Sequence, residues 1–341
     1  MHKKNAQRIT LRDIANATGY SVNTVSKALR DMPDLSEQTK NTIRETAQRM
    51  GYVMNDMASA LRSGFSGVLA LIISDISNPF FGILCKEIEQ QAAKYHYTVI
   101  IFNTEEQEYR ENHAIRTALS KNVDGILLTP SQHSTENITL LQQWGKPCVL
   151  IGRHFPEVAA DAVLFDDEKG GYLAGMHLAQ QGYRRILMLN APHNSSALDR
   201  EQGFRRAMEE SDIESKVVTL DSPLGGISNI LQQEHVQFHF DAIFAYSDLL
   251  AMEAVSCLQQ MGIDPRTVGI VGFDDIQSRL ALPFPLTSVS VGKAAFGEAL
   301  VSLLMKRIDG SAGASAVQKI LPTQLVIRTS TPKKETKDVL L

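Results

Sequence analysis

The chain has 341 residues, of which 43% are hydrophobic, and a formal net charge of −4. This length and composition predict a globular protein of two or three structural units with a sizeable core. The longest apolar runs, such as 68–73, are far shorter than the roughly 18 residues of a membrane-spanning helix. Residues 1–7 are polar and basic, unlike a secretory signal. We therefore expect a cytoplasmic protein without a membrane segment.

Charge and cysteines narrow the function classes further. Residues 1–62 contain ten Lys or Arg and six Asp or Glu, so this segment carries +4 and the remainder carries −8. A small basic head on an acidic body is typical of a protein whose one end meets phosphate. The three cysteines are far apart, which excludes a disulfide framework and a paired-cysteine metal site.

The segment from residue 8 to residue 62 begins with two short helices around a tight turn. Thr10 is an N-cap, and Asp13 three residues later completes a short capping box. Gly19 can adopt the positive φ that ends a helix, and Ser21 caps the next one. This pattern predicts a helix-turn-helix.

The second helix has an apolar inner face and a polar outer face. Val25, Ala28 and Leu29 have the spacing of core residues, and a third helix runs from Ser36 to Gly51. The outer face carries short side chains that suit the major groove of DNA: Val22, Asn23, Thr24, Ser26 and Lys27. From periodicity alone, a generic three-helix bundle without a ligand remains an equal alternative.

Two motifs in this region resemble the lactose/galactose-repressor family of bacterial regulators. The first is the run from Ile9 to Leu29, ITLRDIANATGYSVNTVSKAL, and the second is Asn55 to Arg62, NDMASALR. Their order and distance are those of the family's helix-turn-helix and hinge helix, and the resemblance extends over essentially the whole chain. It implies a DNA-binding domain over 1–54 and a hinge over 55–66.

The resemblance also implies which side chains of the head contact DNA. Base contacts are implied for Val22, Asn23 and Lys27. Phosphate contacts are implied for Thr10, Ser21, Thr24, Ser26, Ser36 and Thr39, and Leu11 is counted among the DNA-binding residues.

The hinge is too short to persist as an isolated helix in water, because helix nucleation is costly. The resemblance implies that Leu61 enters the minor groove as a wedge, with Asn55 and Ala58 also at the DNA. Packing of Leu61 onto the body is the alternative. Asp56 departs from the family's usual neutral or basic residue, and a carboxylate there should weaken DNA binding slightly or face away.

Downstream of the hinge, apolar runs of strand length alternate with helical stretches such as 79–95, 167–181 and 248–261. The predicted strands are 68–74, 98–104, 125–130, 147–152, 162–166, 185–190, 216–220, 242–247, 268–274, 287–291 and 324–328. Continuous apolar strands separated by helices predict parallel sheets covered on both faces. Because one sheet of this size would be unusually large, we expect two α/β arrays.

The family fold agrees with this pattern. It implies an all-α helix-turn-helix head followed by an α/β core, 67–332, of two doubly wound parallel-sheet subdomains of the periplasmic-binding-protein-like type I. The expected subdomains are 67–166 plus 292–322, and 167–291 plus 323–332. The chain should cross between them near Asp166, Val289 and Pro322. The charged tail, 333–341, is too short for a tetramerising coiled coil, so we expect a homodimer.

Ligands of parallel sheets bind beyond the carboxyl ends of the strands, which singles out the residues that follow each strand. Phe80 and Phe81 could stack on an apolar sugar face, although a core role is the more common use of a phenylalanine. Arg200 matches the family's effector-binding arginine, and a surface ion pair is its alternative. The other candidate effector residues are Ser77, Asn78, Thr129, Arg153, Ser247, Asp248 and Asp274. Asn78 is also explained as a helix cap, and Arg153 as the partner of a nearby acid.

These features predict a repressor of a carbohydrate-utilisation operon that binds a palindromic operator and responds to a sugar or sugar derivative. A sugar-transport binding protein and a cytosolic enzyme, such as a glycoside hydrolase using Asp274 and Asp275, are the competing classes. An activator, or a repressor that needs a corepressor, is also open. Val291 and Gly152 stand where some relatives have polar side chains, so the effector's identity is not inherited. No cofactor, metal or catalytic residue is expected; His235 and His239 have helical spacing but no further ligand.

Overall fold

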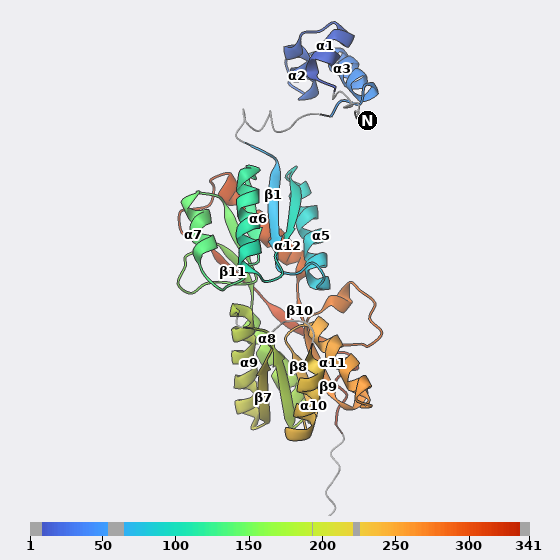
Figure 1. The fold of residues 1–341 in the computed structure, drawn as a ribbon, viewed down its shortest axis with the longest axis vertical. Helices are drawn as coiled ribbons and strands as arrows, with labels where there is room; N and C mark the ends of the chain where they lie inside the picture. Colours follow the sequence, from blue (N-terminus) through green and yellow to red (C-terminus); the bar gives the residue numbers. More distant parts are fainter. Residues whose placement is uncertain (1–8, 54–64, 193, 221–225, 335–341) are drawn as a thin grey trace, which may run out of the picture. The chain divides into compact units, whose positions relative to one another are not determined.

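The computed structural model describes residues 9–53, 65–192, 194–220 and 226–334. The chain divides into two compact units, one up to Ser66 and one from Gly67 onward, which we call the head and the core (Figure 1). The hinge motif and the end of the tail lie outside the described residues. Of the helices within these ranges, none is both long and apolar enough to cross a membrane.

The head is a small three-helix unit. Its helices are α1 (Leu11–Thr18), α2 (Val22–Leu29) and α3 (Glu37–Arg49). The capping signals in the sequence are all present: Thr10 and Asp13 form both bonds of a capping box, Gly19 has φ 74°, and Ser21 and Ser36 cap the next two helices. The buried apolar residues are Ile14, Ala15, Val25, Ala28, Ile43 and Ala47. Periodicity and caps therefore predict this unit correctly.

The first sheet of the core is parallel throughout, in the order β11-β5-β4-β3-β1-β2. Its strands are β1 (Val68–Ile73), β2 (Thr98–Asn103), β3 (Gly125–Leu128), β4 (Cys148–Ile151), β5 (Ala162–Phe165) and β11 (Gln318–Leu321). Side chains of α5 (Pro79–Ala93) and α12 (Lys293–Ile308) share one hydrophobic core with it, and those of α6 (Glu108–Ser120) and α7 (Glu136–Gln143) share another. Both faces of the sheet are thus covered, as continuous apolar strands require.

The second sheet has the order β12-β10-β9-β8-β6-β7, and β12 is its one antiparallel strand. Its strands are β6 (Arg185–Asn190), β7 (Glu214–Thr219), β8 (Ala242–Ala245), β9 (Gly269–Asp274), β10 (Thr287–Val291) and β12 (Thr323–Val326). Its helices are α8 (Asp167–Gln180), α9 (Ser195–Ser211), α10 (Ile227–Gln237) and α11 (Asp248–Gln260), with the short turns η1 (Pro265–Thr267) and η2 (Ile276–Ser278). Side chains of α8 and α9 belong to one hydrophobic cluster, and those of α10 and α11 belong to another.

Each sheet with its helices forms one subdomain, which we call N-terminal and C-terminal after their first strands. The chain passes between them after β5, after β10 and after β11 (Figure 1). The predicted fold class, a helical head followed in the sequence by two parallel α/β arrays, is confirmed. Strand β11 was not predicted, because it is an edge strand whose first three residues are exposed and two of which are polar.

Candidate functional site

The outer face of α2 presents the short side chains that the sequence assigned to DNA. Val22 is 43% exposed and Asn23 is exposed, whereas Thr24, Ser26 and Lys27 are half-buried. The ammonium group of Lys27 pairs with the carboxylate of Asp34. A helix with small, partly polar residues on its first turns has the shape of an element that enters a major groove.

Several residues assigned to phosphates are helix caps. Ser21 Oγ accepts from the backbone N–H of Thr24 at 3.0 Å, and Ser36 Oγ accepts from that of Thr39 at 3.2 Å. These hydroxyls lie at helix N-termini, where backbone N–H groups and the helix dipole attract anions. The Thr10 hydroxyl bonds Asp13, and Leu11 packs against the core of the head rather than standing out from it. Asn55, Ala58 and Leu61 lie outside the described residues.

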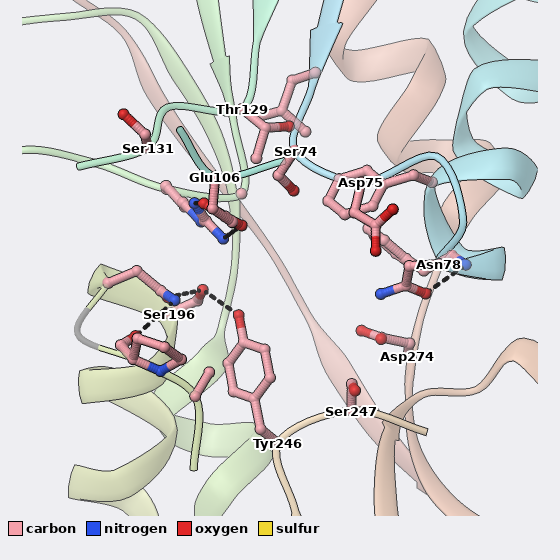
Figure 2. Close-up of a pocket in the computed structure, with 18 of the residues that line it drawn as sticks. Ser74, Asp75, Asn78, Glu106, Thr129, Ser131, Ser196, Tyr246, Ser247 and Asp274 are labelled. Atoms are coloured by element: carbon pink, nitrogen blue, oxygen red, sulfur yellow. Dashed lines mark hydrogen bonds and ion pairs between the residues drawn. The ribbon is translucent and has the colours of Figure 1, made fainter. Parts of the chain in front are cut away.

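The core contains a cavity of about 340 Å³ between its subdomains, at the carboxyl ends of the strands (Figure 2). From the N-terminal subdomain it is lined by Ser74, Asp75, Asn78, Phe80, Phe81, Glu105, Glu106, Thr129, Ser131, His133, Ile151, Gly152, Arg153, Phe165 and Phe296. From the C-terminal subdomain it is lined by Ala191, Pro192, Asn194, Ser196, Arg200, Tyr246, Ser247, Leu249 and Asp274. Its size is within the range of small-molecule sites.

Arg200 is fixed in the floor of the cavity from α9. Its Nε donates to Asp167 Oδ1 at 2.7 Å and its Nη1 donates to the Tyr246 carbonyl at 2.6 Å. The guanidinium carbon lies 3.5 Å from the ring centroid of Phe273. Arg200 is only 5% exposed, so its ion pair is buried and is not the surface ion pair considered as an alternative from the sequence. Among the described residues these bonds engage Nε and Nη1, which leaves Nη2 as a donor for a ligand.

Asp274, at the end of β9, offers a carboxyl group of unusual character. Its φ is 99°, in the left-handed region that non-glycine residues seldom adopt and that is often found at functional sites. Burial raises the pKa of Asp274 to about 7, against the opposing influence of Arg200 and Lys293. Near neutral pH this group can therefore both donate to and accept from a ligand hydroxyl.

Asp248 has a structural position behind the cavity rather than in its wall. Its carboxylate accepts from Ser288 Oγ at 2.6 Å and from the N–H of Ile276 at 2.8 Å. Burial, with the nearby charge of Asp274, raises the pKa of Asp248 to about 8. Asp248 is 1% exposed and is not among the residues that line the cavity, and its carboxyl group joins η2 to β10.

Arg153 follows β4 and lines the cavity, but its charge is already paired. Its Nη1 and Nη2 donate to the two carboxylate oxygens of Glu106 at 2.8 and 2.7 Å, and Nη1 also donates to the Pro130 carbonyl. The bidentate geometry is the strong form of this interaction. An ion pair between Arg153 and a nearby acid was one of the alternatives predicted from the sequence, and that acid is Glu106.

Aromatic rings form one wall. Phe80 is buried and meets Phe81 edge-on with ring centroids 5.3 Å apart, and it meets Phe165 at 6.3 Å. Phe165 in turn lies 4.0 Å from Phe296. Phe80 is therefore part of the core as well as the wall, and the half-buried Phe81 is the ring better placed to stack on a ligand.

Polar groups on the wall are available to a ligand. Thr129 is 3% exposed, and its Oγ1 has no hydrogen-bond partner within the described chain. An unpartnered buried hydroxyl is costly, and a ligand hydroxyl would satisfy it. Figure 2 shows Asp75, Asn78 and Asp274 gathered on one side of the cavity, with Tyr246 and Ser196 on another.

Of the predicted effector residues, all but Ser77 and Asp248 line the cavity. Ser77 is exposed, and its hydroxyl donates to the carboxylate of the lining residue Asp75 at 2.7 Å. Some lining residues that follow strands by one to three positions were not predicted from the sequence, among them Glu106, Ser131, Ala191 and Tyr246. The rule of strand ends could have found them, because they occupy the same positions as the residues it did select.

No group of three or more potential metal ligands occurs among the described residues. The predicted helical spacing of His235 and His239 is wrong, because α10 ends at Gln237 and His239 has φ 52°. The pair therefore does not share a helix face.

Comparison with known proteins supports this organisation. Residues 10–55 match the model described as bacterial regulatory proteins, lacI family, and residues 66–329 match periplasmic binding proteins and sugar binding domain of LacI family. The HTH-type transcriptional regulator DegA of Bacillus subtilis is 31% identical over 338 residues, covering 95% of this chain and 98% of its own. The ribose operon repressor of Halalkalibacterium halodurans is 31% identical over 327 residues, covering 94% and 97%.

Among solved structures, the lac repressor dimer bound to operator and the anti-inducer ONPF superposes with a TM-score of 0.83 at 20% identity. The match covers 96% of this chain and all of that one, which shows a shared fold. The resemblance inferred from the two sequence motifs is confirmed, and the chain belongs to the LacI family of bacterial regulatory proteins.

Proposed function

We propose that this protein is a sequence-specific DNA-binding transcriptional repressor whose operator affinity is set by a small molecule bound in the core cavity. The observation that carries the proposal is the presence, in one chain, of a helix-turn-helix and a ligand-sized cavity between two subdomains. An enzyme or a transport protein would have no use for the helix-turn-helix. A regulator of this kind acts where the chromosome is, in the cytoplasm.

On the DNA side, α2 enters the major groove with Val22 and Asn23 toward the bases. Lys27 contacts the DNA after its ion pair with Asp34 breaks. This costs little, because an ion pair on the surface contributes little to stability. The capping hydroxyls of Ser21 and Ser36 meet phosphates. A homodimer places two such helices on the half-sites of a palindromic operator.

On the effector side, the cavity draws on both subdomains, so a ligand there changes the balance between two subdomain arrangements. Contacts on two sides already join the subdomains: Arg279 pairs with Glu87 at 2.9 Å, and the N–H of Ser195 donates to Gln132 Oε1 at 2.8 Å. A ligand acts only through its different affinity for the two arrangements. Similarity to the ribose operon repressor of Halalkalibacterium halodurans favours a sugar as the effector and a carbohydrate-utilisation operon as the target.

The proposal is tested by selecting bound fragments from a random DNA library with the full-length protein, and then titrating the selected site by fluorescence anisotropy. We expect a palindromic site whose affinity changes with one member of a panel of sugars, sugar acids, sugar phosphates and purines. The direction of that change separates an inducer from a corepressor. Asn41→Ala is the matched control for changes in α2, because Asn41 is an exposed asparagine on α3. Binding without sequence preference would reject the proposal.

A further inference from the structure

Each guanidinium group in the described lining of the cavity is already paired with a carboxylate of the protein. The described lining contains two guanidinium groups, those of Arg153 and Arg200. Arg153 is held by both oxygens of Glu106, and Arg200 is held by Asp167 at 2.7 Å. The remaining basic side chain of this lining is His133.

The carboxylates outnumber these cations. Asp75 lines the cavity, and the hydrogen bonds recorded to its side chain come from the N–H and hydroxyl of Ser77. Asp274 interacts electrostatically with Arg200 and with Lys293, which lies buried behind it and donates to main-chain carbonyls. Arg200 and Lys293 are therefore balanced by acids already in place. An anionic ligand would bring a further negative charge next to these acidic groups, while both guanidinium groups of the described lining are already paired.

Glu106 reaches Arg153 by way of a strained backbone. Glu105 and Glu106 are consecutive residues in the left-handed region, with φ 52° and 56°. Two non-glycine residues of this kind in succession are costly and persist only where their surroundings fix them. The result is that Glu106 pairs with Arg153, while its neighbour Glu105 pairs with Arg110 at 2.6 Å.

We propose that the cavity takes an uncharged polyhydroxylated ligand, such as a neutral sugar, and that Glu106 determines this specificity by neutralising Arg153. The inference rests on the proposed function of the cavity as the effector site. Hydroxyl groups suit the groups on offer, since they donate to the carboxyls of Asp75 and Asp274 and accept from Thr129 and Asn78. A phosphate or carboxylate would need the guanidinium that Glu106 occupies.

Two glutamates of the N-terminal subdomain supply a matched pair of variants. Glu106→Gln removes the partner of Arg153 and exposes a guanidinium to the cavity. Glu89→Gln removes the same charge from an exposed glutamate of α5 that does not line the cavity, and it leaves the Arg153 pair intact. Both glutamines keep the length of the side chain, and thermal unfolding without ligand reports whether each variant is folded.

The experiment measures binding to the full-length protein by isothermal titration and by thermal shift. The probes are neutral pentoses, hexoses and disaccharides, with ribose 5-phosphate, glucose 6-phosphate and gluconate as anionic counterparts. For the wild type we expect a neutral sugar to bind and its charged counterparts to bind at least about tenfold more weakly. Glu106→Gln should gain on the order of tenfold in affinity for the phosphate or acid, and Glu89→Gln should not.

Three results would overturn the inference: a charged member binding the wild type as tightly as its neutral counterpart, no neutral sugar binding at all, or no gain of anion binding in a folded Glu106→Gln. Anion binding by the wild type and anion binding by Glu106→Gln are measured on different proteins, so each result can overturn the inference by itself. Operator affinity is measured in parallel. If a sugar phosphate binds and shifts operator affinity, the inference fails while the proposed function stands; if selective operator binding is absent, the proposed function itself fails.

Discussion

The contact between α8 and α9 allows a stability prediction from atomic distances. The two helices approach so closely that a Cβ on Gly203 would lie 1.8 Å from the carbonyl oxygen of Glu168, and one on Gly171 would lie 2.0 Å from that of Arg200. Because the obstructing atoms are backbone, no side-chain rotation relieves the clash. Gly203→Ala must therefore push the helices apart by more than an ångström.

The magnitude follows from two opposing effects. Alanine in place of glycine in a helix interior gains about 1 kcal/mol. Forcing extra atoms into a packed interface costs about 1 to 3 kcal/mol and sometimes more, and a backbone obstruction is at the upper end. We expect Gly203→Ala to lower the free energy of unfolding by about 2 kcal/mol, which lowers Tm by roughly 4 to 8 °C for a unit of this size. It should also weaken effector binding, since α8 carries Asp167 and α9 carries Arg200.

Gly82 on α5 is the control, because a Cβ there meets nothing within 4 Å. Gly82→Ala should leave Tm unchanged or raise it slightly. Tm is read from thermal unfolding of the full-length protein by circular dichroism. If Gly203→Ala is as stable as Gly82→Ala, the close approach of α8 and α9 is not as described and the reasoning is refuted.

Three further predictions test the DNA face, the effector site and the buried acids. Asn23→Ala should cost about 1 to 3 kcal/mol at the selected operator and much less on random DNA; an equal loss on both would remove Asn23 from base reading. Arg200→Met combined with Asp167→Asn, which leaves no buried charge unpaired, should keep operator binding but abolish the response to the effector found by titration, and a normal response would exclude Arg200 from the site. Because burial raises the pKa of Asp248 to about 8, its contribution to stability is fully present below its unfolded pKa and is lost as the pH rises through 8. Asp248→Asn should therefore lessen the fall of Tm between roughly pH 5 and pH 9, whereas an unchanged slope measured by thermal unfolding would contradict that pKa.

Much of the fold could be predicted because its signals are local. Caps such as Thr10 and Ser36 satisfy backbone groups within one turn, and the buried strands of the core are continuous apolar runs that local sequence reveals. Strand β11 shows the limit of this approach. Its residues Gln318 and Lys319 are exposed, and its place beside β5 is fixed by pairing with a strand more than 150 residues earlier.

The position of the cavity was predictable from the sequence, but the full set of its lining residues was not. Strand ends selected Thr129, Arg153 and Asp274 correctly as lining residues, because parallel strands bring their carboxyl ends to one edge. The same rule selected Asp248, whose side chain turns instead toward Ser288 on β10. Which way a strand-end side chain points depends on the neighbouring strand, and periodicity carries no information about that.

The two arginines show why a residue type can indicate a site without fixing its chemistry. A guanidinium suits a carboxylate, a phosphate or vicinal hydroxyls equally well when it is seen in sequence. In the fold, Arg153 meets Glu106, 47 residues away, and Arg200 meets Asp167, 33 residues away. Each pairing joins separate elements and arises only from tertiary structure. Once both charges are matched within the protein, what the cavity still offers is hydrogen bonding and an aromatic face, and these are the means by which an uncharged sugar is recognised.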